Sequence, residues 1–374
     1  MKKFNIQLTD AQATKVKPVR PEDFDFHAYI DYAEKLNQKC MDFRTAGSGV
    51  VVYRRVRVAD CFSSGCSDMK RSLENQLGAL QKSMKYKADV PNFLEPWYGI
   101  GTIASAFGGD YTWPDGNAPV MKPGFRSIDE ILDHKPLQVA HTKIGKHTLE
   151  MIEYFMDKTR GSLPVSLTDT QSPLNIAGLL LPLDQFFPVL LTEPEKVTGL
   201  FDLIAGLSIE FNHEQIKLIG NALVYPGHGF ASSDKWSGLG MSDDNAVMIS
   251  PEQYLRLAAP AVEKICDFLG GTAFHSCGDW SNWIEAVLKI KGILMADGAF
   301  SAETDPGATD NLEAFHAFAG TGVVLNARIV GNLETIEKQV SRLWCPGMKL
   351  VVVTYCQDPD EQGKAYDLIH QICC

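Results

Sequence analysis

The sequence lacks long hydrophobic runs and any excess of positive charge. No apolar stretch approaches the roughly 18 residues that a membrane-spanning helix needs. Its 46 Asp and Glu residues outnumber 35 Lys and Arg, which gives a formal net charge of −11. Because an acidic surface repels phosphate backbones and anionic lipid heads, we expect no nucleic acid and no membrane among the partners. The opening residues lack the apolar core of a signal peptide, so we expect a cytoplasmic protein.

Two kinds of motif are also missing. We find no repeat of 20–50 residues and neither a G-x-G-x-x-G nor a Walker loop, which dinucleotide- and nucleotide-binding folds use. Nine cysteines are present. An odd number without a secretion signal predicts free thiols, of which some could bind a metal.

Short apolar runs alternate with amphipathic stretches, which is typical of β-strand–α-helix units on a parallel sheet. The expected strands are 49–56, 89–97, 163–169, 221–229, 270–279, 292–300, 322–330 and 349–356. They predict a single (β/α)₈ TIM barrel over residues 46–374, preceded by an N-terminal helical extension over residues 1–45. A doubly wound sheet is the alternative, but it would need the missing glycine loop.

Three potential metal ligands follow two of these strands. His275 and Cys277 stand two residues apart, so on a strand both side chains would leave the same face. Cys356 ends the last strand, and in a closed barrel the strand ends converge on one mouth. One imidazole and two thiolates suit Zn²⁺, and three protein ligands leave open the fourth position that a catalytic zinc needs. Taken singly, each of these residues is better explained as part of the core, and it is their joint placement at two strand ends that favours a metal.

Other polar and aromatic residues follow the earlier strands, and we expect them to bind the substrate. They are Glu95, Trp97, Tyr98, Asp169, Tyr225 and His228. A mouth lined by aromatic and acidic side chains favours an uncharged or aromatic substrate. Packing or loop capping would explain most of these residues as well, although glycines on both sides of His228 favour its presentation at the mouth.

From Gly270 to Ile372 the chain resembles the uroporphyrinogen decarboxylase superfamily, in particular its zinc-dependent corrinoid methyltransferase branch. The residues that carry the resemblance are His275-Ser276-Cys277-Gly278, which match the H-x-C-G of that branch, and Cys356 at a fitting distance. The resemblance implies a catalytic zinc on His275, Cys277 and Cys356. It also makes Asp297, or Glu303 a few residues on, a candidate additional ligand, although Asp297 could equally be a hydrogen-bonded or substrate-binding carboxylate.

This branch moves methyl groups between small substrates and a corrinoid. The chain lacks the D-x-H-x-x-G element of corrinoid-binding domains, so the resemblance implies that a separate corrinoid protein is a partner. We expect a methoxy compound as methyl donor, with a coenzyme M-like thiol as the alternative acceptor. A homodimer is expected only by analogy.

Two further alternatives remain. A tetrapyrrole decarboxylase of this superfamily would carry Arg-Gln-Ala-Gly-Arg after the first strand, whereas this chain has VVVYRRVRVADC there, with Arg54, Arg55 and Arg57. A barrel that binds zinc or a tetrapyrrole without catalysis is the other alternative.

Overall fold

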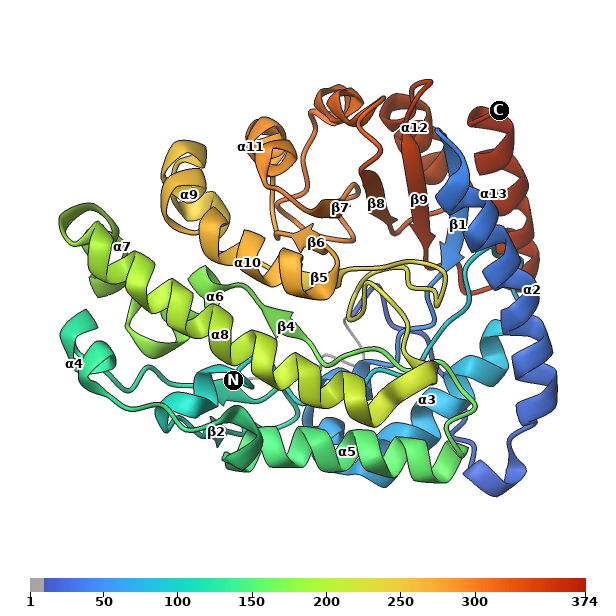
Figure 1. Ribbon diagram of the computed structural model, residues 1–374. Coiled ribbons are helices and arrows are strands. Elements are labelled where there is room, and N and C mark those ends of the chain that lie inside the picture. The colour runs from blue at the N-terminus through green and yellow to red at the C-terminus, as the bar shows by residue number, and fades with distance from the viewer. Residues whose placement is uncertain (1–9) are drawn as a thin grey trace.

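The computed structural model describes residues 10–374, and its centre is a sheet of seven parallel strands (Figure 1). The strands follow the order β1-β9-β8-β7-β6-β5-β4. Their bounds are β1 Gly49–Arg54, β4 Thr170–Gln171, β5 Leu239–Ser242, β6 Thr272–His275, β7 Ile293–Ala299, β8 Val324–Ile329 and β9 Lys349–Thr354. A separate antiparallel pair, β2 (Tyr111–Thr112) and β3 (Val120–Met121), lies in the Pro- and Gly-rich stretch before residue 127.

An extended segment, residues 89–94, lies between β1 and β4, the two edge strands of this sheet. Asp89 N donates to Val52 O of β1 at 2.8 Å, and Leu94 forms a parallel bridge with Val165. Val165 in turn bridges Leu223 in parallel. The strand order therefore runs around a (β/α)₈ barrel, as the sequence predicts.

The early barrel strands are less regular than predicted. The expected strand 89–97 is an irregular extended segment, because Pro91 and Pro96 cannot donate to a ladder. The fourth strand consists of two separate segments. The first bridges Val165 through Leu223, and the second is β5. The two segments meet where Gly240 N donates to Pro226 O at 2.6 Å.

Helices surround the sheet in Figure 1. They are α2 Phe26–Thr45, α3 Met69–Ser83, α4 Ile128–Asp133, α5 Lys143–Thr159, α6 Pro173–Leu180, α7 Leu183–Thr192, α8 Pro194–Ile219, α9 Pro251–Leu257, α10 Ala259–Leu269, α11 Ile284–Lys289, α12 Leu333–Leu343 and α13 Pro359–Ile372. Ser250 is the N-cap of α9 and forms a full capping box with Gln253. No helix within residues 10–374 is long and apolar enough to cross a membrane.

Alternate residues of each strand face two different apolar layers. Val351, Val353 and Tyr355 belong to the cluster inside the barrel, together with Val51 and Tyr53 of β1. Leu350, Val352 and Cys356 belong to the larger cluster between the strands and the helices. This alternation decides which side chains can reach the barrel mouth.

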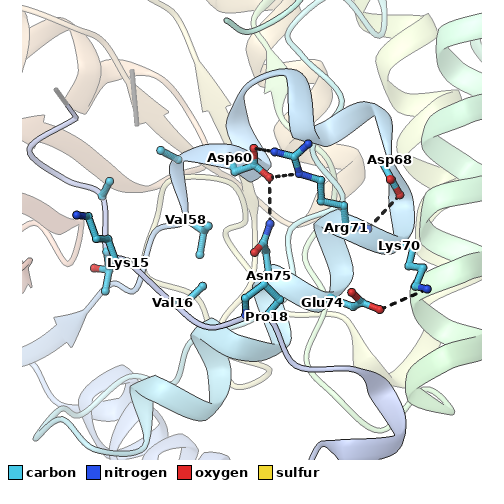
Figure 2. Close-up of a pocket in the computed structure, with 13 residues that line it drawn as sticks. Lys15, Val16, Pro18, Val58, Asp60, Asp68, Lys70, Arg71, Glu74 and Asn75 are labelled. Carbon is cyan, nitrogen blue, oxygen red and sulfur yellow. Dashed lines mark hydrogen bonds and ion pairs between the residues drawn. The ribbon is translucent and has the colours of Figure 1, made fainter. Parts of the chain in front are cut away.

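Within residues 10–45, the N-terminal extension is helical in a short 3₁₀ turn, Pro21–Asp23, and in α2. Residues 13–18 run as an extended segment beside Arg57 and α3. Thr14 N donates to Arg57 O at 2.7 Å. An open groove of about 760 Å³ lies between this segment and α3, where Arg71 binds both oxygens of Asp60 (Figure 2). No histidine or cysteine lines this groove.

Candidate functional site

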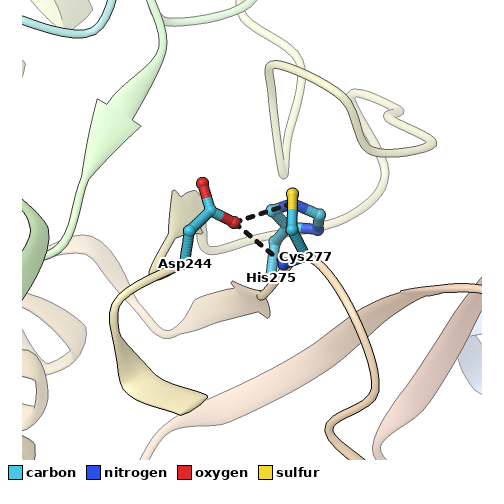
Figure 3. Close-up of side chains that lie close together, drawn as sticks. All are labelled: Asp244, His275 and Cys277. Carbon is cyan, nitrogen blue, oxygen red and sulfur yellow. Dashed lines mark hydrogen bonds and ion pairs between the residues drawn. The ribbon is translucent and has the colours of Figure 1, made fainter. Parts of the chain in front are cut away.

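Asp244, His275 and Cys277 form a compact group at the carboxyl ends of β5 and β6 (Figure 3). One ligand atom of each lies within 4.8 Å of the others, and this is the one such group of three or more His, Cys, Asp or Glu side chains within residues 10–374. His275 Nε2 is 3.5 Å from Cys277 Sγ and 3.4 Å from Asp244 Oδ1. The parallel pairing of Ser242 with His275 brings the two strand ends together.

A buried carboxylate fixes the orientation of the His275 ring. Asp297 Oδ2 lies 2.6 Å from His275 Nδ1, and it also accepts a hydrogen bond from Arg328 Nε at 2.9 Å. The other oxygen of Asp297 accepts from Asn326 Nδ2. With Nδ1 held by Asp297, Nε2 faces Cys277 and Asp244, which is the arrangement found at metal-binding histidines.

The charges of the group stabilise one another. Burial raises the pKa of Asp244, but its contacts with His275 and Cys277 outweigh burial and lower this pKa to about 2. Burial also acts to raise the pKa of Asp297, and the charge of Arg328 is the main cause of its net lowering. For His275 burial lowers the pKa, yet bonds to Asp244, Asp297 and Cys277 raise it well above its usual value. The ionised carboxylates of Asp244 and Asp297 therefore balance the charges of His275 and Arg328.

Cys356, expected as the third ligand, lies apart from this group. Its side chain belongs to the apolar layer beneath the helices with Val352, and its carbonyl oxygen accepts a hydrogen bond from Arg54 Nε at 2.7 Å. Burial raises the pKa of its thiol to about 11. The physical reason is the alternation of β9, which turns Tyr355 inward and Cys356 outward. Asp244, which the sequence does not single out as a ligand, lies beside His275 and Cys277 instead.

Four of the expected substrate-binding residues lie in one network. His228 Nδ1 is 2.6 Å from Glu95 Oε2, and its Nε2 is 3.6 Å from Asp169 Oδ2. Trp97 Nε1 donates to the same oxygen of Asp169 at 3.0 Å. Gly227 and Gly229 both have positive φ, so glycines do present the His228 side chain.

The other expected residues lie elsewhere. Tyr98 stacks on His147 at 3.8 Å between ring centroids. Tyr225 pairs through its backbone with Ser233. Glu303 is exposed and outside the metal-ligand group, and Asp297 touches that group only through His275.

His228 and His275 line one cavity of about 240 Å³ at the barrel mouth. Its other lining residues are Asp10, Gln12, Arg55, Arg57, Gly229, Phe230, Ser242, Asp297 and Arg328. The arginines differ from the sequence-based expectation, which is a mouth of aromatic and acidic side chains. A signal for them exists: Arg55 and Arg57 continue the inward-facing series of Val51 and Tyr53.

Each arginine of the cavity has a carboxylate partner. Arg55 Nη2 donates to Glu95 at 3.2 Å, Arg57 pairs with Asp10, and Arg328 pairs with Asp297. The described N-terminal segment therefore contributes Asp10 and Gln12 to the cavity, which the sequence does not predict.

Comparisons with known proteins agree with this architecture. No curated protein matches the chain in sequence. Among solved structures, a methyltransferase from Methanosarcina mazei is similar, with a TM-score of 0.63 at 12% identity over 90% of this chain and 98% of that chain. At this identity the likeness concerns the fold. The profile of the Uroporphyrinogen decarboxylase (URO-D) family matches residues 39–345, and the chain belongs to this family.

Proposed function

We propose that the chain is a zinc-dependent methyltransferase that moves a methyl group between a small substrate and the corrinoid of a partner protein. The observation that carries the proposal is the convergence of His275 Nε2, Cys277 Sγ and the Asp244 carboxylate at the barrel mouth. The likeness in fold to a methyltransferase adds support.

The two distances from His275 Nε2 to its neighbours fit a tetrahedral zinc. Bonds of about 2.0 Å to nitrogen or oxygen and about 2.3 Å to sulfur imply ligand–ligand distances of about 3.5 Å for N···S and about 3.3 Å for N···O. The observed values are 3.5 Å between His275 and Cys277 and 3.4 Å between His275 and Asp244. Three protein ligands leave one position for a substrate atom.

The chain's own residues then have distinct tasks. Asp297 holds the His275 ring, and the cavity beside it positions the substrate. When bound, zinc would act as a Lewis acid on the heteroatom that loses or gains the methyl group. His228 is the second imidazole on the cavity, and we assign to it proton exchange with that heteroatom.

Cavity size distinguishes this proposal from a tetrapyrrole decarboxylase. The three arginines could bind substrate carboxylates, as a decarboxylase requires. However, about 240 Å³ is below the usual range of roughly 300–1,000 Å³ for small-molecule sites and far too small for a tetrapyrrole. A corrinoid is also too large, which supports its delivery at the mouth by a partner protein.

The substrate is either a methoxy compound or a thiol. Because arginines line the cavity, the reason for expecting an uncharged substrate no longer holds. A methoxy compound and a thiol are both compatible with the metal group.

The test is methyl transfer between free cobalamin and small substrates. Purified, zinc-supplemented chain would be mixed with methylcobalamin and thiols, and separately with cobalt(I) cobalamin and methoxyaromatic compounds, while the corrinoid spectrum is followed. We expect one of the two reactions to proceed and to be lost in Cys277→Ala but retained in Cys356→Ala. Absence of both reactions with a zinc-loaded chain would refute the proposal.

A further inference from the structure

A pocket of about 190 Å³ lies at the amino-terminal end of the barrel. Lys349 and Val324, the first residues of β9 and β8, both line it. Because the strands are parallel, this end is opposite to the carboxyl ends at which His275 and Cys277 lie. Active sites of (β/α)₈ barrels lie at the carboxyl ends of the strands, so this pocket is separate from the proposed active site.

Most of the pocket wall is apolar. It includes the rings of Phe43 and Trp236, whose centroids are 6.2 Å apart. A hydrogen bond from Trp236 Nε1 to Cys40 O at 3.1 Å holds the indole in place. The other apolar lining residues are Pro226, Leu294, Met295 and Val324. Such a wall favours an apolar group, because contact with it removes apolar surface from water.

Two cations line the same pocket, and neither forms an ion pair within residues 10–374. Lys349 is only 8% exposed, and its Nζ donates to Arg44 O at 2.9 Å. Arg44 is exposed and donates from Nη1 to Lys235 O at 2.6 Å. Burial and the charge of Arg44 lower the pKa of Lys349, and no carboxylate in the described part of the chain acts against them.

The charge of Lys349 therefore lacks a partner. A buried ammonium beside a second cation is unfavourable unless a negative group balances it. An ammonium has three N–H donors, and one of those of Lys349 has an acceptor among residues 10–374. The chain has a formal net charge of −11, so carboxylates are plentiful but none is placed here. An anion from outside the chain would supply the missing partner.

We propose that this pocket binds a small carboxylic acid with an apolar body. The carboxylate accepts charge-assisted hydrogen bonds from Lys349 and Arg44. The apolar body lies against the rings of Phe43 and Trp236. Its size is limited to a single ring or a short branched chain, because a cavity of roughly 150 Å³ is enough for benzene. The site needs neither zinc nor a corrinoid, so the inference does not rest on the proposed function.

The test measures the binding of benzoate, isovalerate, benzamide and acetate to the purified full-length chain by calorimetry, without added zinc. Benzamide lacks the charge, and acetate lacks the apolar body. We expect benzoate or isovalerate to bind about 10-fold more tightly than both controls, which corresponds to one charge-assisted contact. The tighter of the two acids shows whether the body is a ring or a branched chain. Equal binding of both acids and benzamide, or no binding of the acids at millimolar concentrations, would overturn the inference.

Variants distinguish this pocket from the arginines of the barrel mouth. Lys349→Met keeps an unbranched side chain but removes the charge, and should weaken acid binding by about 10-fold without changing benzamide binding. Arg44→Glu alters an exposed side chain, which spares the fold, and offers Lys349 a carboxylate of the chain itself. This variant should weaken acid binding by at least about 10-fold.

The matched control is Lys82→Met. Lys82 also donates to a backbone carbonyl, that of Lys15, and burial also lowers its pKa, but it does not line the pocket. This variant should bind the acids as the wild type does. If either Lys349→Met or Arg44→Glu keeps the acid affinity of the wild type, or if Lys82→Met loses as much as they do, the inference is wrong.

Discussion

Replacing Asp297 with asparagine should weaken zinc binding by about 10- to 100-fold, the usual effect of removing a carboxylate behind a metal-binding histidine. One oxygen of Asp297 receives His275 Nδ1 and Arg328 Nε, and the other receives Asn326 Nδ2. Asparagine has a single acceptor oxygen, so its NH₂ group must face one of these hydrogen-bond donors and that hydrogen bond is lost. The loss corresponds to about 1.4–2.7 kcal/mol of binding free energy.

The assay is competition for zinc against a chromogenic chelator at neutral pH. Glu95→Gln is the matched control, because Glu95 is also a buried carboxylate bound to an arginine and a histidine, Arg55 and His228. Both variants should lose about 3–5 kcal/mol of unfolding free energy, since each leaves a buried arginine unpaired. Only Asp297→Asn should lose zinc affinity. Equal affinity in the two variants would refute the assignment of His275 Nε2 as a ligand.

Other predictions concern stability. Burial acts to raise the pKa of Asp89, but four hydrogen bonds from surrounding groups outweigh burial and lower this pKa from 3.8 to about 2. The ionised carboxylate therefore contributes about 2.5 kcal/mol to the free energy of unfolding above about pH 4. This contribution is lost as the pH falls toward 2. Asp89→Asn should be less stable at neutral pH and should show a flatter dependence over this range in urea denaturation; a loss that does not change with pH would contradict this. Gly78→Ala should destabilise by about 1–3 kcal/mol because its Cβ would lie 2.2 Å from Lys17 O, whereas Gly363→Ala in α13, with nothing within 4 Å, should be neutral or stabilising. Thermal denaturation checks the pair, and equal midpoints would refute the packing of the N-terminal segment against α3.

The later strands could be predicted from the sequence because their runs contain no proline, and β9 is mostly β-branched. The runs 322–330 and 349–356 contain β8 and β9 with ends shifted by at most two residues. β5 was missed, since Leu239–Ser242 includes a glycine and no β-branched residue. Prolines made the segment around Leu94 irregular, which a strand pattern alone does not reveal.

The candidate metal group was predictable in part. The spacing of His275 and Cys277 places both side chains on one side, and the structure brings them together. Asp244 was not predictable as a neighbour, because its position depends on the pairing of Ser242 with His275, and register is a tertiary property. Cys356 follows the last strand, as expected. Because side chains alternate along the chain, Tyr355 faces the inside of the barrel and the Cys356 side chain faces the helices.

The most direct test of the account is the zinc content of four purified proteins under reducing, metal-replete conditions. The wild type should hold about one zinc per chain, in line with one site of three protein ligands. Cys277→Ser and Asp244→Asn should lose most of it, and Cys356→Ser should retain it. Loss of zinc in Cys356→Ser with retention in Asp244→Asn would contradict Asp244 as the third ligand, and a wild type without zinc would contradict the metal site itself.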